Sequence, residues 1–234
     1  MQSTPLMQNS RAPHVAVIMD GNRRWARARG LADAAGHQAG VQALRRIVEA
    51  APGEGIATLT VYAFSSDNWR RPENEVNALM ALMLAYLDSE TEEMVRNGVR
   101  FTAIGRRDRL LPELVSEIER TENLTAWGDG LNLRVAVDYS ARASILEAAR
   151  KLPQTGSDAE LADLIAGEAG DVDLLIRTGN EQRLSDFLLW ECSYAELYFA
   201  RALWPDFSEK DLAAAMQEFR GRDRRFGGAS ACAA

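Results

Sequence analysis

Short apolar runs rich in β-branched residues recur along this chain, and stretches with helical spacing of apolar residues separate most of them. This alternation favours a mainly parallel sheet covered on both faces, because each parallel connection has to cross over the sheet. The expected strands are 14–19, 57–64, 99–104, 131–137, 172–176 and 196–199. The fold class is therefore α/β, with a six-stranded, mainly parallel sheet flanked by helices.

The expected helices differ in how apolar they are. The first has Val41, Leu44 and Ile47 on one face and ends near Pro52. A long helix from Glu73 to about residue 97 is apolar nearly all the way round its middle, which predicts burial on several sides or a wall of an apolar cavity. Shorter helices are expected around 114–118, 142–152, 161–165 and 209–219.

Length and composition indicate one globular domain. The 234 residues contain no obvious linker, so residues 14–228 are expected to form a single domain between a flexible N-terminal tail (1–13) and a C-terminal tail (229–234). Apolar residues make up 47% and charged residues 26%, as in ordinary soluble proteins. The net charge of −7 does not fit nucleic acid as a partner.

The two cysteines, Cys192 and Cys232, provide neither a disulfide framework nor a metal-ligand spacing, which fits a reducing cytosol and predicts a cytoplasmic protein. Residues 1–13 lack the apolar core of a signal peptide. The longest apolar stretch, 78–87, is far shorter than the ~20 residues of a membrane-spanning helix.

Polar residues follow three of the expected strands, in the segments 20–24, 65–71 and 177–185. The carboxyl ends of parallel strands share one edge of the sheet, which is where open α/β sheets bind ligands. Asp20 comes directly after its strand, and Arg23 and Arg24 follow it closely. A carboxylate and two arginines in this position indicate a metal-bridged polyanion; a polar turn with solvated arginines is the alternative.

The third segment contains Arg177, Arg183 and Ser185, which can form a cradle for phosphate or diphosphate; a solvated loop is the alternative. Glu196 begins a strand in an apolar setting and so requires a partner, either Mg²⁺ or an arginine in an internal salt bridge. His37 opens the first long helix, where backbone amides favour anions; a structural hydrogen bond is its alternative.

Two further kinds of residue are expected to be structural. His14 has no other chemistry-bearing residue close to it in the sequence. Trp25 and Trp69 each follow a polar motif, where they either pack in the core or shape an apolar substrate site.

The chain has no Walker loop, dinucleotide-binding glycine motif, nucleophile elbow or His-Glu-x-x-His motif. Asn22 stands where an aspartyl-phosphate phosphatase has its second aspartate, and no Asp-Asp-x-x-Asp motif of the helical trans-prenyl synthases is present.

Taken together, the motif segments resemble the cis-prenyltransferases, the undecaprenyl (di-trans,poly-cis) diphosphate synthase family, from His14 to about Gly228. The motifs that carry this resemblance are Met19-Asp20-Gly21-Asn22-x-Arg24-Trp25, Gly36-His37-x-Ala39-Gly40, Tyr62-Ala63-Phe64-Ser65-Ser66-x-Asn68-Trp69-x-Arg71-Pro72, Ile176-Arg177-Thr178-Gly179, Arg183-x-Ser185-x-Phe187-Leu188-Leu189-Trp190, Tyr194-Ala195-Glu196-Leu197-Tyr198-Phe199, Trp204-Pro205-Asp206-Phe207 and Arg224-Arg225-Phe226-Gly227-Gly228.

The resemblance implies a homodimeric prenyltransferase with an apolar tunnel beside the sheet. Such an enzyme uses Mg²⁺ to condense isopentenyl diphosphate onto an allylic primer, farnesyl or geranyl diphosphate, and yields a polyprenyl diphosphate. A long, undecaprenyl-like product is expected, and its release implies peripheral contact with a membrane. The alternatives are a short-chain cis-prenyl synthase and a non-catalytic partner subunit of a heteromeric synthase.

The resemblance also implies roles for individual residues. Asp20 and Asn68 are the expected catalytic residues, and Asp20 and Glu196 the expected metal ligands. The residues expected to bind substrate are Gly21, Asn22, Arg23, Arg24, Trp25, His37, Ser65, Trp69, Arg71, Arg177, Arg183 and Ser185. The segment Arg225-Phe226-Gly227 resembles a C-terminal motif that reaches the partner subunit's site.

Several positions depart from the common pattern of this family. Arg23 stands where glycine is frequent. Asp33 replaces an arginine that often helps to hold the allylic diphosphate, so binding there is expected to rely on Arg23, Arg24 or Arg27. The other departures are Asp138 and Asp186, which replace asparagines, and Asn180, which replaces a second glycine. They bear on substrate preference and chain length. The small side chains of Ala63 and Ala136 are expected to leave room in the tunnel.

Overall fold

The computed structural model describes residues 12–224, and its centre is a six-stranded sheet in the order β3-β4-β2-β1-β5-β6. The strands are β1 (His14–Ile18), β2 (Thr58–Ser65), β3 (Arg100–Ile104), β4 (Asn132–Tyr139), β5 (Leu174–Arg177) and β6 (Glu196–Phe199). Every neighbouring pair is parallel. The predicted six-stranded sheet is therefore confirmed, and within the described residues it is parallel throughout.

The helices also follow the predicted order. They are α1 (Asn22–Ala28), α2 (Asp33–Ala50), α3 (Glu73–Arg96), α4 (Pro112–Thr125), α5 (Ala141–Lys151), α6 (Asp158–Ala166) and α7 (Glu209–Gly221), with short 3₁₀ helices η1 (Pro52–Glu54), η2 (Ser66–Arg70), η3 (Gly167–Ala169) and η4 (Trp204–Asp206). Sequence reasoning missed α1 and η2, because each is too short to show an apolar period and lies within a polar segment.

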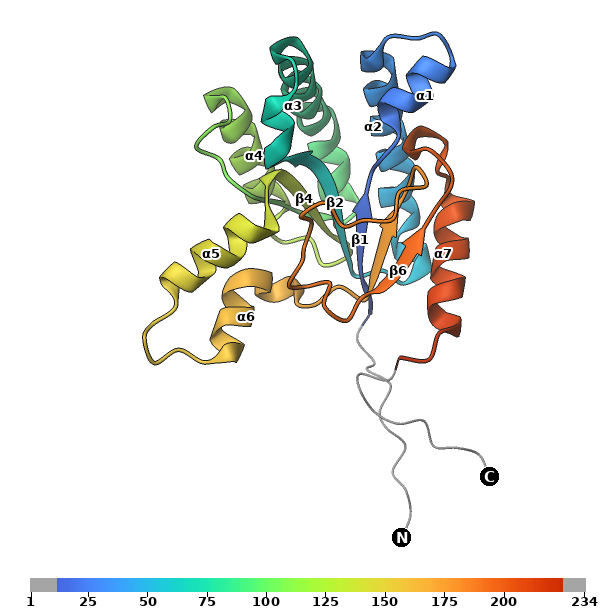
Figure 1. Cartoon of the computed structure of the whole chain (residues 1–234). Coiled ribbons are helices and arrows are strands. Elements are labelled where there is room, and N and C mark those ends of the chain that lie inside the picture. The colour runs from blue at the N-terminus through green and yellow to red at the C-terminus, as the bar shows by residue number, and fades with distance from the viewer. Residues whose placement is uncertain (1–11, 225–234) are drawn as a thin grey trace, which may run out of the picture.

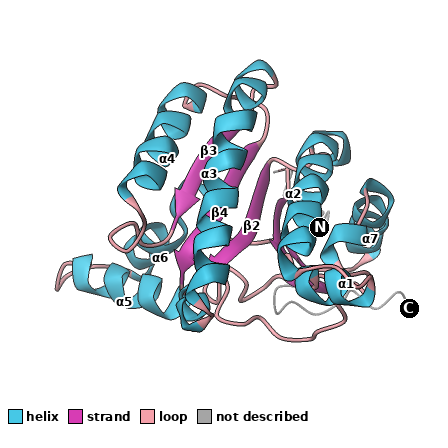
Figure 2. Cartoon of the chain, turned by 90° about the horizontal axis from the view of Figure 1, so that it is seen from above, coloured by secondary structure: helices cyan, strands magenta, loops and turns pink. Residues whose placement is uncertain are grey.

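The two faces of the sheet are covered by different parts of the chain (Figures 1 and 2). Val15 and Val17 of β1 belong to the larger core, which α2, α3, α4 and α7 share. Ala16 and Ile18 point the other way, into a smaller core with Phe187. Figure 1 shows α5 and α6 on the opposite side of the molecule from α7. Burial on both faces explains why β1 is a continuous apolar run rather than an alternating one.

Two glycines let α1 lie directly on α2. A Cβ atom at Gly36 would lie 2.1 Å from the carbonyl oxygen of Asn22, and one at Gly40 would lie 2.4 Å from its side-chain Oδ1. No larger residue fits at Gly36 without moving the backbone of α1, and one at Gly40 would displace the Asn22 side chain. The motif around His37 therefore fixes the close approach that holds α1 at the carboxyl edge of the sheet.

Backbone conformation explains the departures at Asp138, Asn180 and Asp186. All three have a positive φ, of 47°, 60° and 62° respectively. Among side-chain-bearing residues, Asn and Asp adopt this left-handed region most readily, because their short side chains hydrogen-bond locally. Asp186 also accepts a hydrogen bond from the backbone nitrogen of Arg142 at 3.1 Å, at the start of α5. These replacements keep the backbone shape that asparagine or glycine would support.

Some predictions lie at the limits of the described chain. Residues 1–11 and 225–234, which include Cys232 and Arg225-Phe226-Gly227, lie outside the described residues. The expected tails and the boundaries of the domain therefore stay predictions. Between residues 12 and 224, no helix has the length and apolar character needed to cross a membrane. Cys192 is a free, buried thiol.

His14 is structural, as expected, and its burial has a consequence for stability. Its Nε2 lies 2.7 Å from the hydroxyl of Thr60 and its Nδ1 lies 3.3 Å from the carbonyl oxygen of Gly170. Burial, and then the positive charge of Arg134, lowers the pKa of His14 from 6.5 to about 4. The imidazole is therefore neutral in the folded protein at neutral pH.

Stability is expected to decline in acid because of this histidine. Between pH 6.5 and about 4, His14 is protonated in the unfolded chain but stays neutral in the folded protein. The free energy of unfolding therefore falls as the pH drops through this range. The shift corresponds to about 3 kcal/mol, present in full above pH 6.5 and lost by about pH 4. Urea unfolding across this range should show a shallower decline for His14→Gln. Parallel declines in the two proteins would contradict the assignment.

Candidate active site

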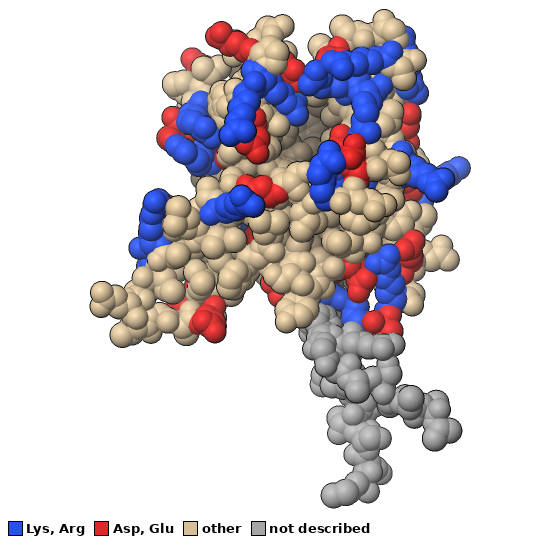
Figure 3. Space-filling view, viewed as in Figure 1, with Lys and Arg blue, Asp and Glu red and all other residues tan. Residues whose placement is uncertain are grey.

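A pocket of about 730 Å³ opens at the carboxyl edge of the sheet. Figure 3 shows it as a hollow at the top of the molecule with basic side chains around it. Every predicted site residue except Trp25, Trp69 and Glu196 lines this pocket. The three polar segments that follow β1, β2 and β5 therefore converge, as the parallel arrangement predicted.

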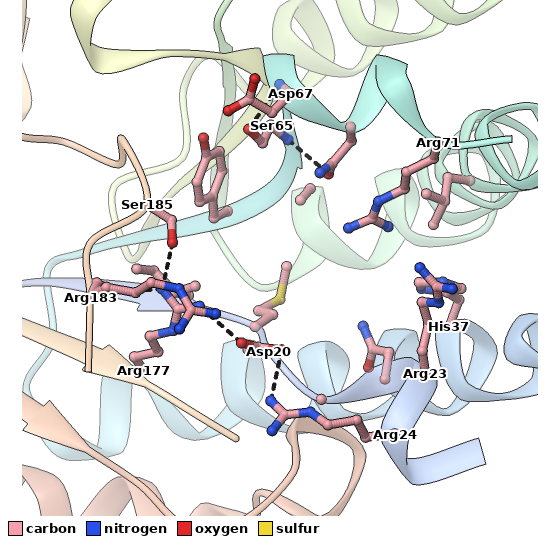
Figure 4. Close-up of a pocket in the computed structure, with 18 of the residues that line it drawn as sticks. Asp20, Arg23, Arg24, His37, Ser65, Asp67, Arg71, Arg177, Arg183 and Ser185 are labelled. Carbon is pink, nitrogen blue, oxygen red and sulfur yellow. Dashed lines mark hydrogen bonds and ion pairs between the residues drawn. The ribbon is translucent and has the colours of Figure 1, made fainter. Parts of the chain in front are cut away.

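Arg177 and Asp20 form the centre of one half of the pocket. The Arg177 side chain is only 4% exposed; its Nη2 donates to Asp20 Oδ2 at 2.9 Å and its Nη1 donates to Ser185 Oγ at 2.8 Å. Asp20 Oδ1 accepts a second hydrogen bond from Arg24 Nη2 at 3.0 Å. Figure 4 shows Arg177, Arg183 and Ser185 together on this side of Asp20. This half presents guanidinium and hydroxyl donors suited to phosphate oxygens.

The other half gathers Arg23, His37 and Arg71, which Figure 4 shows on the far side of Asp20. The carboxylate of Glu75, 13% exposed, lies 3.0 Å from Arg71 Nη1, 3.6 Å from Arg23 Nη1 and 3.9 Å from His37 Nε2. Sequence reasoning missed Glu75, although its spacing of four residues from Arg71 at the start of a helix is a recognisable ion-pair signal. A single acid therefore lies near two arginines and His37, which come from three parts of the chain.

His37 is poised to interact with a ligand rather than with the protein. Burial, and then the charge of Arg71, lowers its pKa below the usual 6.5, so the ring is neutral at pH 7. Its Nε2 is buried without a hydrogen-bond partner, and so is Oδ1 of Asn22, which lines the same pocket. Buried polar atoms normally have partners, so these two mark places that a bound molecule or water would satisfy.

The loop after β2 is held in one conformation by its own side chains. Ser65 Oγ accepts from the backbone nitrogen of Asp67, and Asn68 Oδ1 accepts from the backbone nitrogen of Ser65, both at 3.1 Å. These bonds leave the amide NH₂ of Asn68 as its donor group. Ser65 and Asn68 thus cap η2 and line the pocket at the same time.

A second missed residue, Arg109, anchors this loop to the sheet. Its Nε donates at 2.8 Å to the buried carboxylate of Asp138, which also accepts from Ser66 Oγ at 2.9 Å. The Arg109 guanidinium lies 5.4 Å from the centre of the Trp69 ring. The aspartate at the usual asparagine position therefore gains an ion pair that ties η2 to β4.

Trp25 and Trp69 do not line the pocket, so their expected contact with substrate stays a prediction. Trp25 donates from Nε1 to Asp206 at 2.6 Å, with Arg29 stacked on its ring at 4.2 Å. Trp69 packs edge-to-face on Phe64, with ring centres 5.3 Å apart. Trp69 thus packs against the larger core, whereas Trp25 is held by a hydrogen bond and a cation–π contact.

Glu196 does not join Asp20 within one protomer, so a metal pair of these two carboxylates is not assembled by one chain and stays a prediction. Glu196 begins β6 and is in register with Leu174, roughly 10 Å before the level of Arg177 along the strands. Its Oε2 accepts from Arg222 Nη1 at 2.7 Å. In a parallel sheet, the first residue of a strand lies at the edge opposite the ligand site, so the internal salt bridge is the observed outcome.

Asp20, beside the phosphate-binding arginines, fits a Mg²⁺ site at the pocket. The described part of the chain has no group of three or more His, Cys, Asp and Glu side chains able to hold a metal. Mg²⁺ is commonly held by one or two carboxylates together with substrate phosphates, which matches a lone carboxylate beside phosphate-binding arginines.

A smaller apolar cavity of about 100 Å³ adjoins the pocket and shares Met19, Ala63 and Leu79 with it. Its other walls include Leu44 of α2, Leu82, Met83 and Tyr86 of α3, and Val135 and Val137 of β4. The expectation that the long apolar helix lines a cavity is therefore confirmed. The role expected for Ala136 is wrong, because alternate residues of a strand face opposite ways and Ala136 packs in the smaller core.

A two-part cationic pocket beside an apolar cavity, at the carboxyl edge of a parallel sheet, defines a protein that binds phosphorylated molecules with hydrocarbon tails. The sequence model of a family described as putative undecaprenyl diphosphate synthase matches residues 18–227. The chain belongs to this family, and it is an isoprenyl transferase.

Curated relatives support this membership along nearly the whole chain. "Isoprenyl transferase 1" of Bradyrhizobium diazoefficiens is 57% identical over 99% of this chain and 95% of its own length. The Escherichia coli K12 enzyme named ditrans,polycis-undecaprenyl-diphosphate synthase, (2E,6E)-farnesyl-diphosphate specific, is 46% identical over 92% of this chain and 89% of its own.

Solved structures of similar proteins share the fold. The lavandulyl diphosphate synthase of Lavandula x intermedia, in complex with dimethylallyl diphosphate, has a TM-score of 0.88 at 38% identity and covers 92% of this chain and 97% of its own. A probable undecaprenyl diphosphate synthase of Campylobacter jejuni has a TM-score of 0.79 at 35% identity, covering 93% and 99%.

Replacing Arg177 with lysine is expected to weaken binding of inorganic pyrophosphate at least about tenfold, because an ammonium cannot hold Asp20 and Ser185 at once and still present a fork to an anion. Titration calorimetry measures this directly. Arg220→Lys is the matched control, since Arg220 pairs with Glu54 outside the pocket and should bind as the native protein does. Equal affinity for both variants would contradict this role for Arg177.

Proposed function

We propose that this chain elongates farnesyl diphosphate by successive condensation with isopentenyl diphosphate, in a Mg²⁺-dependent reaction that forms cis double bonds. The observation that carries the proposal is the pocket itself. It has two separate groups of cations, one on each side of Asp20, and it adjoins an apolar cavity through Met19, Ala63 and Leu79. Two diphosphates and one growing hydrocarbon chain match these three features.

The two substrates are assigned to the two halves. Isopentenyl diphosphate binds at Arg177, Arg183 and Ser185, and the allylic diphosphate binds over the segment from Gly21 to Arg24, beside His37. In this arrangement the diphosphates lie on either side of Asp20. Asn68 and Arg71 belong to the segment after β2 and line the pocket beside both substrates.

The reaction breaks the carbon–oxygen bond of the allylic diphosphate, and the electron pair leaves with the diphosphate. The double bond of isopentenyl diphosphate attacks the allylic carbon, and loss of a proton leaves the new cis double bond. The arginines stabilise the departing charge, and the Asn68 amide donates to a diphosphate oxygen. Asp20 would hold Mg²⁺ together with diphosphate oxygens, and the bound ion supplies further electrostatic stabilisation of the leaving group.

The apolar cavity bears on product length. Its 100 Å³ is below the 300–1,000 Å³ that is usual, roughly, for ligand pockets, so α2 and α3 would have to separate as the chain lengthens. The narrow cavity favours a short-chain cis-prenyl synthase as the second candidate. The undecaprenyl-like product remains our first proposal, because Ala63 leaves room where the cavity meets the pocket. The non-catalytic partner subunit is disfavoured by the retained Asp20 and Arg177.

We also propose that the chain works as a homodimer. The edge strand β6 exposes Leu197, and Tyr194 just before it is 65% exposed. Leu146 of α5 and Leu164 of α6 are exposed apolar residues as well. Edge strands and exposed apolar side chains are features that association with a second copy would cover.

Incubation with farnesyl diphosphate, labelled isopentenyl diphosphate and Mg²⁺ tests the function. Chromatography of the products is expected to show a ladder that converges on a long polyprenyl diphosphate. Asp20→Ala is expected to lower kcat by at least about a hundredfold, since it removes the metal ligand and the partner of Arg177. A product that stops after one or two additions would establish the short-chain alternative. If neither the native protein nor Asp20→Ala forms any product, the partner-subunit alternative is the one that remains.

The oligomeric state is tested separately by light scattering. The native protein is expected to have twice the 25.8 kDa mass of one chain. Leu197→Arg places a charge at the exposed edge of β6 and is expected to shift the mass toward that of the monomer. A native monomer at micromolar concentration would overturn the proposal.

A further inference from the structure

Asp33 does not line the cationic pocket but contacts two of its arginines. Its Oδ2 accepts from Arg23 Nε at 2.8 Å, and its two carboxylate oxygens accept from Nε and Nη2 of Arg27, each at 2.9 Å. Arg23 and Arg27 line the pocket, whereas Asp33 does not. One carboxylate at the start of α2 therefore holds two guanidinium groups of α1.

Asp33 is ionised and Arg23 and Arg27 are protonated at neutral pH. Hydrogen bonds from Arg27 and Arg23 outweigh partial desolvation and lower the pKa of Asp33 to about 2, and the same contact raises the pKa of Arg27. The cluster thus carries two positive charges and one negative charge. Arg23 and Arg27 are four residues apart on one helix, where like charges repel each other. The carboxylate between them offsets this repulsion.

The geometry leaves the ligand-binding atoms free of Asp33. The carboxylate uses Nε of both arginines and Nη2 of Arg27, so Arg27 Nη1 and both terminal nitrogens of Arg23 are not bonded to it. An arginine side chain has large rotamer freedom, and fixing its Nε edge beforehand lowers the entropy lost when an anion binds. Exposed ion pairs add little stability to a fold, so the value of this one lies in orientation.

We propose that Asp33 is the positioning residue for the allylic-diphosphate half of the pocket: it fixes the Nε edges of Arg23 and Arg27 and leaves their other nitrogens for the diphosphate. Arg23 Nη1 lies 3.6 Å from Glu75 and exchanges that partner for the ligand. This inference rests on the proposed function for the identity of that diphosphate. A negative charge near an anion site would by itself weaken binding. Here the carboxylate does not line the pocket and its charge is matched by two guanidinium groups, so orientation outweighs repulsion.

Three variants test this role: Asp33→Asn removes the charge, Asp33→Glu keeps it, and Asp108→Asn is the matched control. Asp108 accepts two hydrogen bonds from Arg106, which lower its pKa, but it lies away from this pocket. Binding of farnesyl diphosphate alone is measured by titration calorimetry, since without isopentenyl diphosphate no elongation occurs. Steady-state kinetics then give kcat and the KM of each substrate.

Asp33→Asn is expected to weaken farnesyl diphosphate binding about tenfold and to raise its KM similarly, through lost orientation of two charge-assisted donors. The KM of isopentenyl diphosphate and kcat should stay within about twofold, and the melting temperature within about 3 °C, because exposed pairs contribute little stability. Asp33→Glu should recover most of the affinity, and Asp108→Asn should match the native protein.

Unchanged or tighter binding by Asp33→Asn would overturn the proposal; tighter binding would mean that the carboxylate competes with the ligand. A loss of kcat or of stability without a change in affinity would also overturn it. If the native protein does not elongate farnesyl diphosphate, the proposed function fails. The same comparison with inorganic pyrophosphate still decides the role of Asp33, because it needs no turnover.

Discussion

The ion pair between Asp20 and Arg177 is the interaction on which the site depends. It joins the residues at the carboxyl ends of β1 and β5, and the Arg177 side chain is almost completely buried. A buried cation requires a counter-charge, so Asp20 has to stay at this position for the end of the sheet to be stable. The same pair leaves guanidinium and carboxylate groups at the floor of the pocket. Fold stability and ligand chemistry are therefore coupled at one contact.

Carboxylates organise the rest of the pocket in the same manner. Asp20 holds Arg24 and Arg177, Glu75 holds Arg71 near Arg23, and Asp33 holds Arg23 and Arg27. A cluster of cations without such partners would repel itself before any anion arrived. Paired in this way, the arginines keep a fixed geometry in the free protein and can exchange some partners for diphosphate oxygens when substrate binds.

The segments that carry these residues are rigid for local reasons. Non-glycine residues with positive φ occur at Asn180, Ser185, Asp186 and Leu188, which places strained backbone at the phosphate cradle. The loop after β2 is capped by Ser65 and Asn68 and anchored through Arg109 to Asp138. Side chains that sequence reasoning assigned to substrate binding thus also shape the pocket through contacts with one another.

The sequence by itself determined the succession of strands and helices along the chain, because the apolar period and the turn residues are local signals. It also determined that Asp20, Ser65 and Arg177 share an edge, since parallel strands put their carboxyl ends together. Only the tertiary structure decided which partners the side chains contact. Trp25 bonds to Asp206, Trp69 packs on Phe64, Glu196 pairs with Arg222, and Asp33 pairs with Arg23. Most of these contacts join residues far apart in the sequence, and no local pattern encodes their proximity.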